Sequence, residues 1–185
     1  MHRHFILHKP YGYLSQFKYE LKRNKKLLGE LYNFPIGTMA IGRLDEDSEG
    51  LLLLTTDGKV SDSICSGRFE KEYFVQVDGL ISIKAVEELQ NGVVIGFEGK
   101  KYTTKPCKAF IINTIPDFGN RAKKIRDDRH GPTSWLSITI NEGKFRQVRK
   151  MTAAIGFPTL RLVRVRVGSI YLNDLKAGEV REIEL

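Results

Sequence analysis

The sequence predicts an α+β fold, in which several short strands form a sheet and a few helices pack on it. Three observations predict it: short apolar runs recur along the chain, two segments have helical spacing, and no internal repeat or low-complexity tract interrupts them. At 185 residues the chain suits one domain or two closely packed halves, and it is long enough to bury a sizeable core.

Six segments have the apolar and β-branched composition of strands. They are residues 5–8, 38–41, 51–55, 73–77, 105–112 and 136–140. Two segments predict helices, because residues 84–91 are followed by Gly92, and residues 144–155 by Gly156 and Pro158. The second helix would place an apolar stripe on one face and three cations on another; the stripe is Phe145, Val148, Thr152 and Ile155, and the cations are Arg146, Arg149 and Lys150.

The charge of the chain favours a polyanionic partner. It carries 30 Lys and Arg against 22 Asp and Glu, for a net charge of +8. Positive charge is concentrated in residues 113–133, here called the basic loop, which carries Arg121, Lys123, Lys124, Arg126 and Arg129. We expect an exposed loop, and leave open whether it contacts the polyanionic partner or is only a solvated insertion.

Several classes of protein are disfavoured. No run of about 18 apolar residues exists, and the N-terminus lacks the apolar core of a secretory signal. Cys65 and Cys107 lie far apart without a C-x-x-C partner, which predicts reduced thiols in a cytoplasmic protein. The four histidines lack ligand spacing, so we expect no metal.

Residues 42–50, Gly-Arg-Leu-Asp-Glu-Asp-Ser-Glu-Gly, form the densest carboxylate cluster, directly before the apolar run 51–55. Burying an ionised carboxylate costs several kcal/mol unless it is paired, so acids on a turn that joins a core strand point to a reactive carboxylate. A calcium loop would need glutamate at its twelfth position, where this chain has Thr56. A solvated polar turn stays open as the simpler interpretation.

The same segment resembles the active-site signature of the RsuA-type ribosomal RNA pseudouridine synthases. Three more segments resemble that family in the same order: Lys9-Pro10-Tyr11-Gly12, residues 71–75, and residues 142–151 with Gly156-Phe157-Pro158. Residues 14–17, 132–136 and 156–164 resemble its large-subunit branch. The resemblance implies the pseudouridine synthase fold, a mixed and mostly antiparallel sheet with flanking helices and an active-site cleft. Residues 1–185 would be one catalytic domain of two packed subdomains, with a boundary near residue 65, and no segment resembles the S4 RNA-binding module.

The resemblance also implies the site residues. Asp45, Tyr73 and Arg149 would be catalytic. Asp45 would act at the sugar, by removing the C2′ proton or by attacking carbon, and both routes stay open. Arg149 would pair with Asp45 and favour its ionised form. Tyr73 would stack on the target uracil and take the last proton, although its alternation with Val75 and Val77 also fits a core aromatic.

Four more residues would bind the substrate: Arg43, Lys144, Arg146 and Leu162. Arg43 would enter the RNA where the uridine is extruded, Lys144 and Arg146 would contact phosphates, and Leu162 would cushion the flipped base.

The implied activity is site-specific isomerisation of uridine to pseudouridine in ribosomal RNA, in the 23S RNA of the large subunit, by a monomer that needs no cofactor. One alternative is a non-catalytic RNA-binding or ribosome-assembly protein on the same fold. Another is a glycoside hydrolase that uses Asp45 with Asp47 or Glu49. Neighbouring acids on one turn fit that class poorly, because its two carboxylates flank a sugar.

Overall fold

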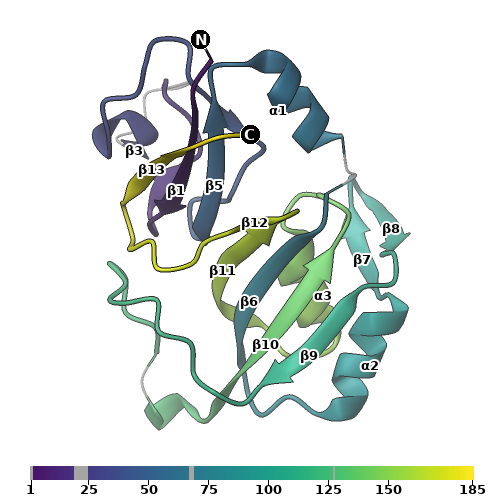
Figure 1. Cartoon of the computed structure of the whole chain (residues 1–185). Coiled ribbons are helices and arrows are strands. Elements are labelled where there is room, and N and C mark those ends of the chain that lie inside the picture. Colours follow the sequence, from purple (N-terminus) through teal and green to yellow (C-terminus); the bar gives the residue numbers. More distant parts are fainter. Residues whose placement is uncertain (1, 19–24, 67–68, 127) are drawn as a thin grey trace. The chain divides into compact units, whose positions relative to one another are not determined.

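The computed structural model describes residues 2–18, 25–66, 69–126 and 128–185, and the chain forms two compact units (Figure 1). The first unit comprises Met1–Phe69, Phe118–Lys123 and Val163–Leu185, and the second comprises Glu70–Asp117 and Lys124–Leu162. Strands and helices occur in both, which confirms the α+β class. The predicted subdomain boundary near residue 65 stays a prediction.

The first unit is built on a mixed sheet. Its elements are β1 (His4–Lys9), β2 (Tyr13–Leu14), β3 (Lys26–Leu27), the 3-10 turn η1 (Leu28–Glu30), β4 (Met39–Ile41), β5 (Glu49–Thr55), α1 (Gly58–Cys65), the end of β11 (Thr159–Val167), β12 (Ile170–Tyr171) and β13 (Val180–Ile183). β1 pairs antiparallel with β13 and β5, whereas β5 pairs parallel with β11. The expectation of a mixed, mostly antiparallel sheet is therefore confirmed here.

The second unit has an antiparallel sheet in the order β6-β10-β9, with two helices and a hairpin. Its elements are β6 (Lys71–Asp78), α2 (Ile83–Asn91), β7 (Val94–Phe97), β8 (Lys100–Thr103), β9 (Lys108–Ile112), η2 (Asp128–His130), β10 (Thr133–Ile140) and α3 (Gln147–Ala154). Alternate residues of β6 are buried, namely Tyr73, Val75 and Val77, as the period of two predicts.

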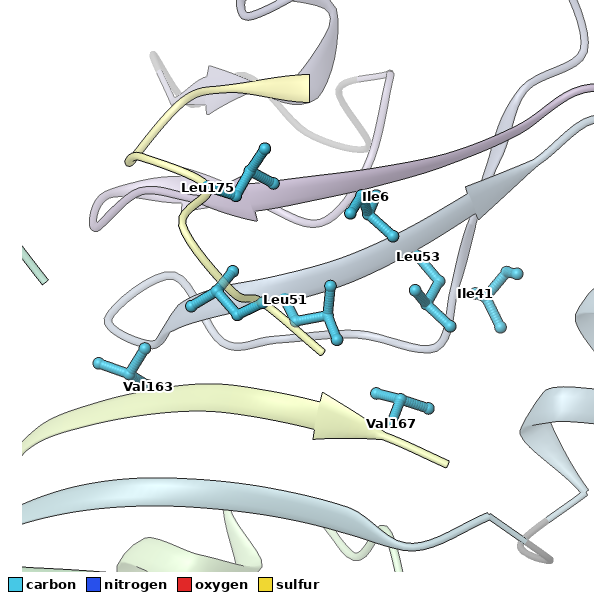
Figure 2. Packing of buried hydrophobic residues seen from close by; sticks show 8 residues of the cluster. Ile6, Ile41, Leu51, Leu53, Val163, Val167 and Leu175 are labelled. Carbon is cyan, nitrogen blue, oxygen red and sulfur yellow. The ribbon is translucent and has the colours of Figure 1, made fainter. Parts of the chain in front are cut away.

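β5 is the central strand of the first unit, and every one of its residues is buried. A continuous apolar run suits a strand that is covered on both faces, which is why Leu51–Leu54 forms the core. Figure 2 shows Ile41 beside Leu53, and Val163 and Val167 pointing from β11 toward β5. The acidic turn, residues 42–48, is thus attached to the most buried strand of its unit.

Gly50, at the start of β5, is required by the close approach of β11. Its φ is 104°, and a Cβ there would overlap the carbonyl oxygen of Arg164 and lie 2.6 Å from the Arg164 amide nitrogen. We expect Gly50→Ala to lower the free energy of unfolding by about 2 kcal/mol or more, measured by urea denaturation. Gly58→Ala is the control, because Gly58 begins α1 with open space around it and should be neutral or slightly stabilised. Equal stability of the two variants would contradict the close packing at Gly50.

All six predicted strands and both helices are found, with shifted ends. β9 begins at Lys108 and not at residue 105, and β10 begins three residues earlier than predicted, at Thr133. The segments missed include α1, β11 and β13. α1 has no fully buried residue, so it has little apolar pattern to detect, and β11 places Arg161 and Arg164 at buried positions. Within the described part of the chain, no helix is both long and apolar enough to cross a membrane.

Candidate active site

The acidic turn lies between β4 and β5 and holds Asp45 at a half-buried position. The turn closes through a hydrogen bond from the Ser48 amide to the Asp45 carbonyl, at 3.0 Å. The Ser15 hydroxyl donates to the Leu44 carbonyl (2.8 Å) and accepts from the Leu44 amide (3.0 Å). Ser15 therefore ties the residue before Asp45 to the segment that follows β2, which gives the carboxylate a defined place.

Lys9 is buried beside this turn. Its ammonium donates to the carbonyls of Tyr13 (2.7 Å) and Pro10 (3.0 Å), and its side chain is completely shielded from solvent. Burial lowers the pKa of Lys9 to about 7, although the carboxylates of the turn, with Glu49 and Asp47 first, act in the opposite direction. Nothing in the sequence singled out Lys9 beyond its place in the Lys-Pro-Tyr-Gly segment. In the structure, Lys9 supplies a cation within the same unit as Asp45.

The buried ammonium predicts a pH dependence of stability. The unfolded chain keeps Lys9 protonated up to its ordinary pKa of 10.5, whereas the folded chain releases the proton near pH 7. Between these values the unfolded state binds more protons, so the contribution of Lys9 to the free energy of unfolding rises with pH. We expect the stability of the wild type relative to Lys9→Met to increase from pH 7 to 10, as measured by urea denaturation. A difference independent of pH would contradict the lowered pKa.

Glu49, the last acid of the cluster, is buried and paired with Arg121. The Arg121 Nε lies 3.0 Å from the Glu49 carboxylate, and the two side chains are only 9% and 2% exposed. The guanidinium carbon of Arg121 lies 4.1 Å from the centre of the Tyr11 ring, a cation-π contact. Arg121 comes from the basic loop, so the prediction that the loop is exposed is wrong at this residue, while Lys123 and Lys124 are exposed as expected. Arg126 is also held, by an ion pair with Asp78.

In the second unit, Tyr73 lies on β6 opposite Ile138 of β10, and only 9% of it is exposed. Leu162 on β11 is 5% exposed. Both positions fit the packing of a core, and both are compatible with a pocket wall. Their roles toward a uracil stay predictions.

The segment from Lys144 to Lys150 differs from the prediction. α3 begins at Gln147, and Arg146 precedes it with a left-handed φ of 52°, so residues 144–146 are not helical. Phe145 is 66% exposed and does not join the apolar stripe. The residues of α3 that are buried are Gln147, Val148, Met151 and Thr152.

The physical reason is the Gln147 side chain, which local spacing alone cannot reveal. Its Oε1 accepts from the Lys144 amide at 3.0 Å, and its Nε2 donates to Glu142 at 2.6 Å. These bonds fold residues 142–147 into a loop and turn Gln147 inward. The Lys144 ammonium lies over the Phe97 and Tyr102 rings, at 4.7 and 5.1 Å from their centres.

The predicted site residues divide between the units. Asp45 and Arg43 belong to the first unit, and Tyr73, Lys144, Arg146, Arg149 and Leu162 belong to the second. The pairing of Asp45 with Arg149 stays a prediction. Among the residues that the structure describes, no three His, Cys, Asp or Glu side chains gather in a group that could hold a metal ion.

Comparisons with known proteins agree on one family. The family model described as "RNA pseudouridylate synthase" matches residues 3–154. The chain is 44% identical over 183 residues to "Ribosomal large subunit pseudouridine synthase E" of Vibrio parahaemolyticus, covering 97% of this chain and 73% of that one. It is 41% identical over 172 residues to the protein of the same name from Xanthomonas axonopodis pv. citri, covering 92% and 88%. A solved structure entitled "Crystal structure of pseudouridylate synthase" superposes with a TM-score of 0.77 at 28% identity, covering 100% of this chain and 71% of that one.

Proposed function

Because the chain belongs to the RNA pseudouridylate synthase family, we propose that it converts specific uridines of ribosomal RNA to pseudouridine and that its target lies in the 23S RNA of the large subunit. The observation that carries the proposal is the acidic turn, which holds Asp45 half-buried just before the fully buried strand β5. Similarity to large-subunit enzymes over nearly the whole chain supports the choice of RNA.

The chemistry is an isomerisation without redox change. The bond between N1 of uracil and C1′ of ribose breaks, the uracil turns, a bond forms between C5 and C1′, the proton on C5 leaves and N1 gains one. Asp45 acts at the ribose, either by taking the C2′ proton or by attacking carbon. Both routes require an ionised carboxylate and neither consumes a cofactor.

Two cations supply positive charge near that carboxylate in the proposed mechanism. Lys9 supplies positive charge from within the first unit while its ammonium is protonated, supported by its burial beside the turn. Arg149 supplies the direct partner of Asp45 in the substrate-bound enzyme. Tyr73 stacks on the uracil and takes the C5 proton, and Leu162 packs against the flipped base.

The RNA is held by cations around the site. Arg43 enters the strand beside the extruded uridine, and Lys144 and Arg146 bind backbone phosphates. The net charge of +8 and the exposed position of Arg43 support these RNA-binding roles. In this proposal the enzyme acts as a monomer in the cytoplasm, and residues 1–185 work as one catalytic domain with an active-site cleft.

The test is to map pseudouridines in ribosomal RNA from cells with and without the gene. We expect one modified position of the 23S RNA to revert to uridine in the deletion strain and to return when the wild-type gene is restored. An unchanged map would overturn the proposal. RNA binding without any change in modification would instead favour the non-catalytic assembly protein.

Tyr73→Phe tests the proposed base. The ring is kept, so we expect RNA binding to be unchanged, while the rate of pseudouridine formation falls by about 100-fold because the last proton has lost its acceptor. The rate is measured under single-turnover conditions. The control is Tyr171→Phe, which removes a hydroxyl from an exposed tyrosine of β12. Equal rates for the two variants would remove Tyr73 from the proton transfer.

A further inference from the structure

The first unit contains an open cavity of about 330 Å³ that none of Asp45, Tyr73 and Leu162 lines. One wall is Ser15, Gln16 and Phe17, and the other includes Met39, Ala40 and Arg43. This volume lies at the lower end of the range for small-ligand pockets, roughly 300–1,000 Å³, and suits one flat ring better than an extended ligand.

The cavity is linked to the acidic turn. Ser15, in its wall, makes both hydrogen bonds to the backbone of Leu44, the residue before Asp45. Arg43 lines the cavity directly and is two residues from Asp45. The cavity therefore lies against the chain segment that carries the proposed catalytic carboxylate.

The apolar part of the wall can pack against a ring. Phe17 is fixed by an edge-on contact with Phe34, with ring centres 5.4 Å apart. Met39 is 38% exposed, so its thioether is accessible from solvent. Aromatic and thioether groups pack well against the face of an aromatic ring.

The polar part of the wall can hold an anion. The Arg43 guanidinium donates to the Gln16 side-chain oxygen at 3.1 Å, and the Gln16 amide nitrogen donates to the Lys18 carbonyl at 2.9 Å. Gln16 is thus held from both ends and orients Arg43, whose guanidinium carries five N–H donors. Among the residues that the structure describes, the wall includes one cation and no acidic side chain. A flat ring attached to an anion is the chemistry of a nucleotide.

We infer that this cavity binds the base of an unpaired nucleotide that neighbours the target uridine in the RNA substrate, with Arg43 on its phosphate. The inference rests on the proposed function, because it assumes that the target uridine is brought to Asp45. Recognition of the neighbouring base by this cavity would help to determine which uridine the enzyme modifies. Arg43 then binds substrate as part of a built pocket, oriented by Gln16.

The first test fills the cavity. We expect Ala40→Phe to lower kcat/KM for pseudouridine formation by about tenfold, mainly through a higher KM. The added ring would occupy the space in which the neighbouring base binds. The matched control is Ile36→Phe, which adds a ring at a fully exposed residue of the same unit that does not line the cavity. Equal kcat/KM values for the two variants would overturn the inference.

A second variant tests the cavity independently, in case Ala40→Phe does not fold. Gln16→Ala only shortens a partly exposed side chain and releases Arg43, so we expect the fold to be kept and KM to rise about threefold. A KM equal to that of the wild type would count against the cavity as an RNA site.

Ultraviolet crosslinking of the wild-type protein to ribosomal RNA identifies which nucleotide binds in the cavity. We expect a crosslink from residues 15–17 or 38–43 to the nucleotide beside the modified uridine, and its loss in Ala40→Phe. Crosslinks only elsewhere on the chain, or an occupant that is a peptide, would overturn the inference. These results are distinct from failure of the proposed function, in which the wild type would form no pseudouridine at all.

Discussion

Asp45→Asn is expected to abolish pseudouridine formation, with a loss of rate of at least about 10⁴-fold. The amide keeps the shape of the carboxylate but can neither remove a proton from the sugar nor attack its carbon. Asp45 is half-buried on a turn that is closed by a hydrogen bond from the Ser48 amide to the Asp45 carbonyl, a bond that asparagine can also make, so the fold should remain. The rate is measured in a single turnover with ribosomal RNA, beside RNA binding and urea denaturation of the same preparation.

The control for this change is Asp62→Asn, which removes the same charge from an exposed position of α1 in the same unit. We expect it to keep the wild-type rate. Appreciable turnover by Asp45→Asn or Asp45→Ala, in a protein that binds RNA normally, would defeat the assignment of Asp45 as the catalytic carboxylate.

Arg121→Met is expected to have the largest effect on stability. It removes the buried guanidinium that pairs with Glu49, whose side chain is only 2% exposed, and so weakens the compensation of a charge inside the first unit. Breaking a buried ion pair in this way costs about 3–5 kcal/mol, which corresponds to a fall in Tm of about 10 °C for a chain of this size. The measurement is urea denaturation at neutral pH, with Tm as a second reading.

Two further variants isolate the ion pair. Lys123→Met changes an exposed cation two residues away and should alter the free energy of unfolding by less than about 0.5 kcal/mol. Arg121→Met combined with Glu49→Leu should recover part of the lost stability, because the carboxylate that lost its guanidinium is then also removed. If Arg121→Met is as stable as Lys123→Met, the pair does not form in solution.

Arg121 also shows what charge patterning could and could not predict. The basic loop was expected to present its cations to solvent or RNA, which holds for Lys123 and Lys124. Arg121 instead packs on Tyr11 and pairs with Glu49, two residues that are remote from it in the sequence. A guanidinium in a polar loop carries no local signal of burial, so only the path of the folded chain could assign this partner.

The prediction of a helix at residues 144–155 was partly wrong for a similar reason. Spacing by three and four residues predicted its position, and α3 occupies its middle and end. The predicted start of the helix was wrong because the Gln147 side chain forms hydrogen bonds to Lys144 and Glu142, which hold residues 142–147 in a loop. A side chain that bonds to nearby backbone competes with the helix, and periodicity does not record that competition.

The sequence by itself determined six of the strands, because alternation and continuous apolar runs are properties of neighbouring residues and do not depend on the rest of the fold. It also determined the family, through an ordered set of short segments, and with it the choice of Asp45 as the candidate carboxylate. Only the tertiary structure decided that Lys9 is buried beside the acidic turn, that Glu49 pairs with Arg121, and that Ser15 links a cavity to the residue before Asp45. Those contacts depend on which distant segments the fold brings together, and desolvation and ion pairing act only once they meet.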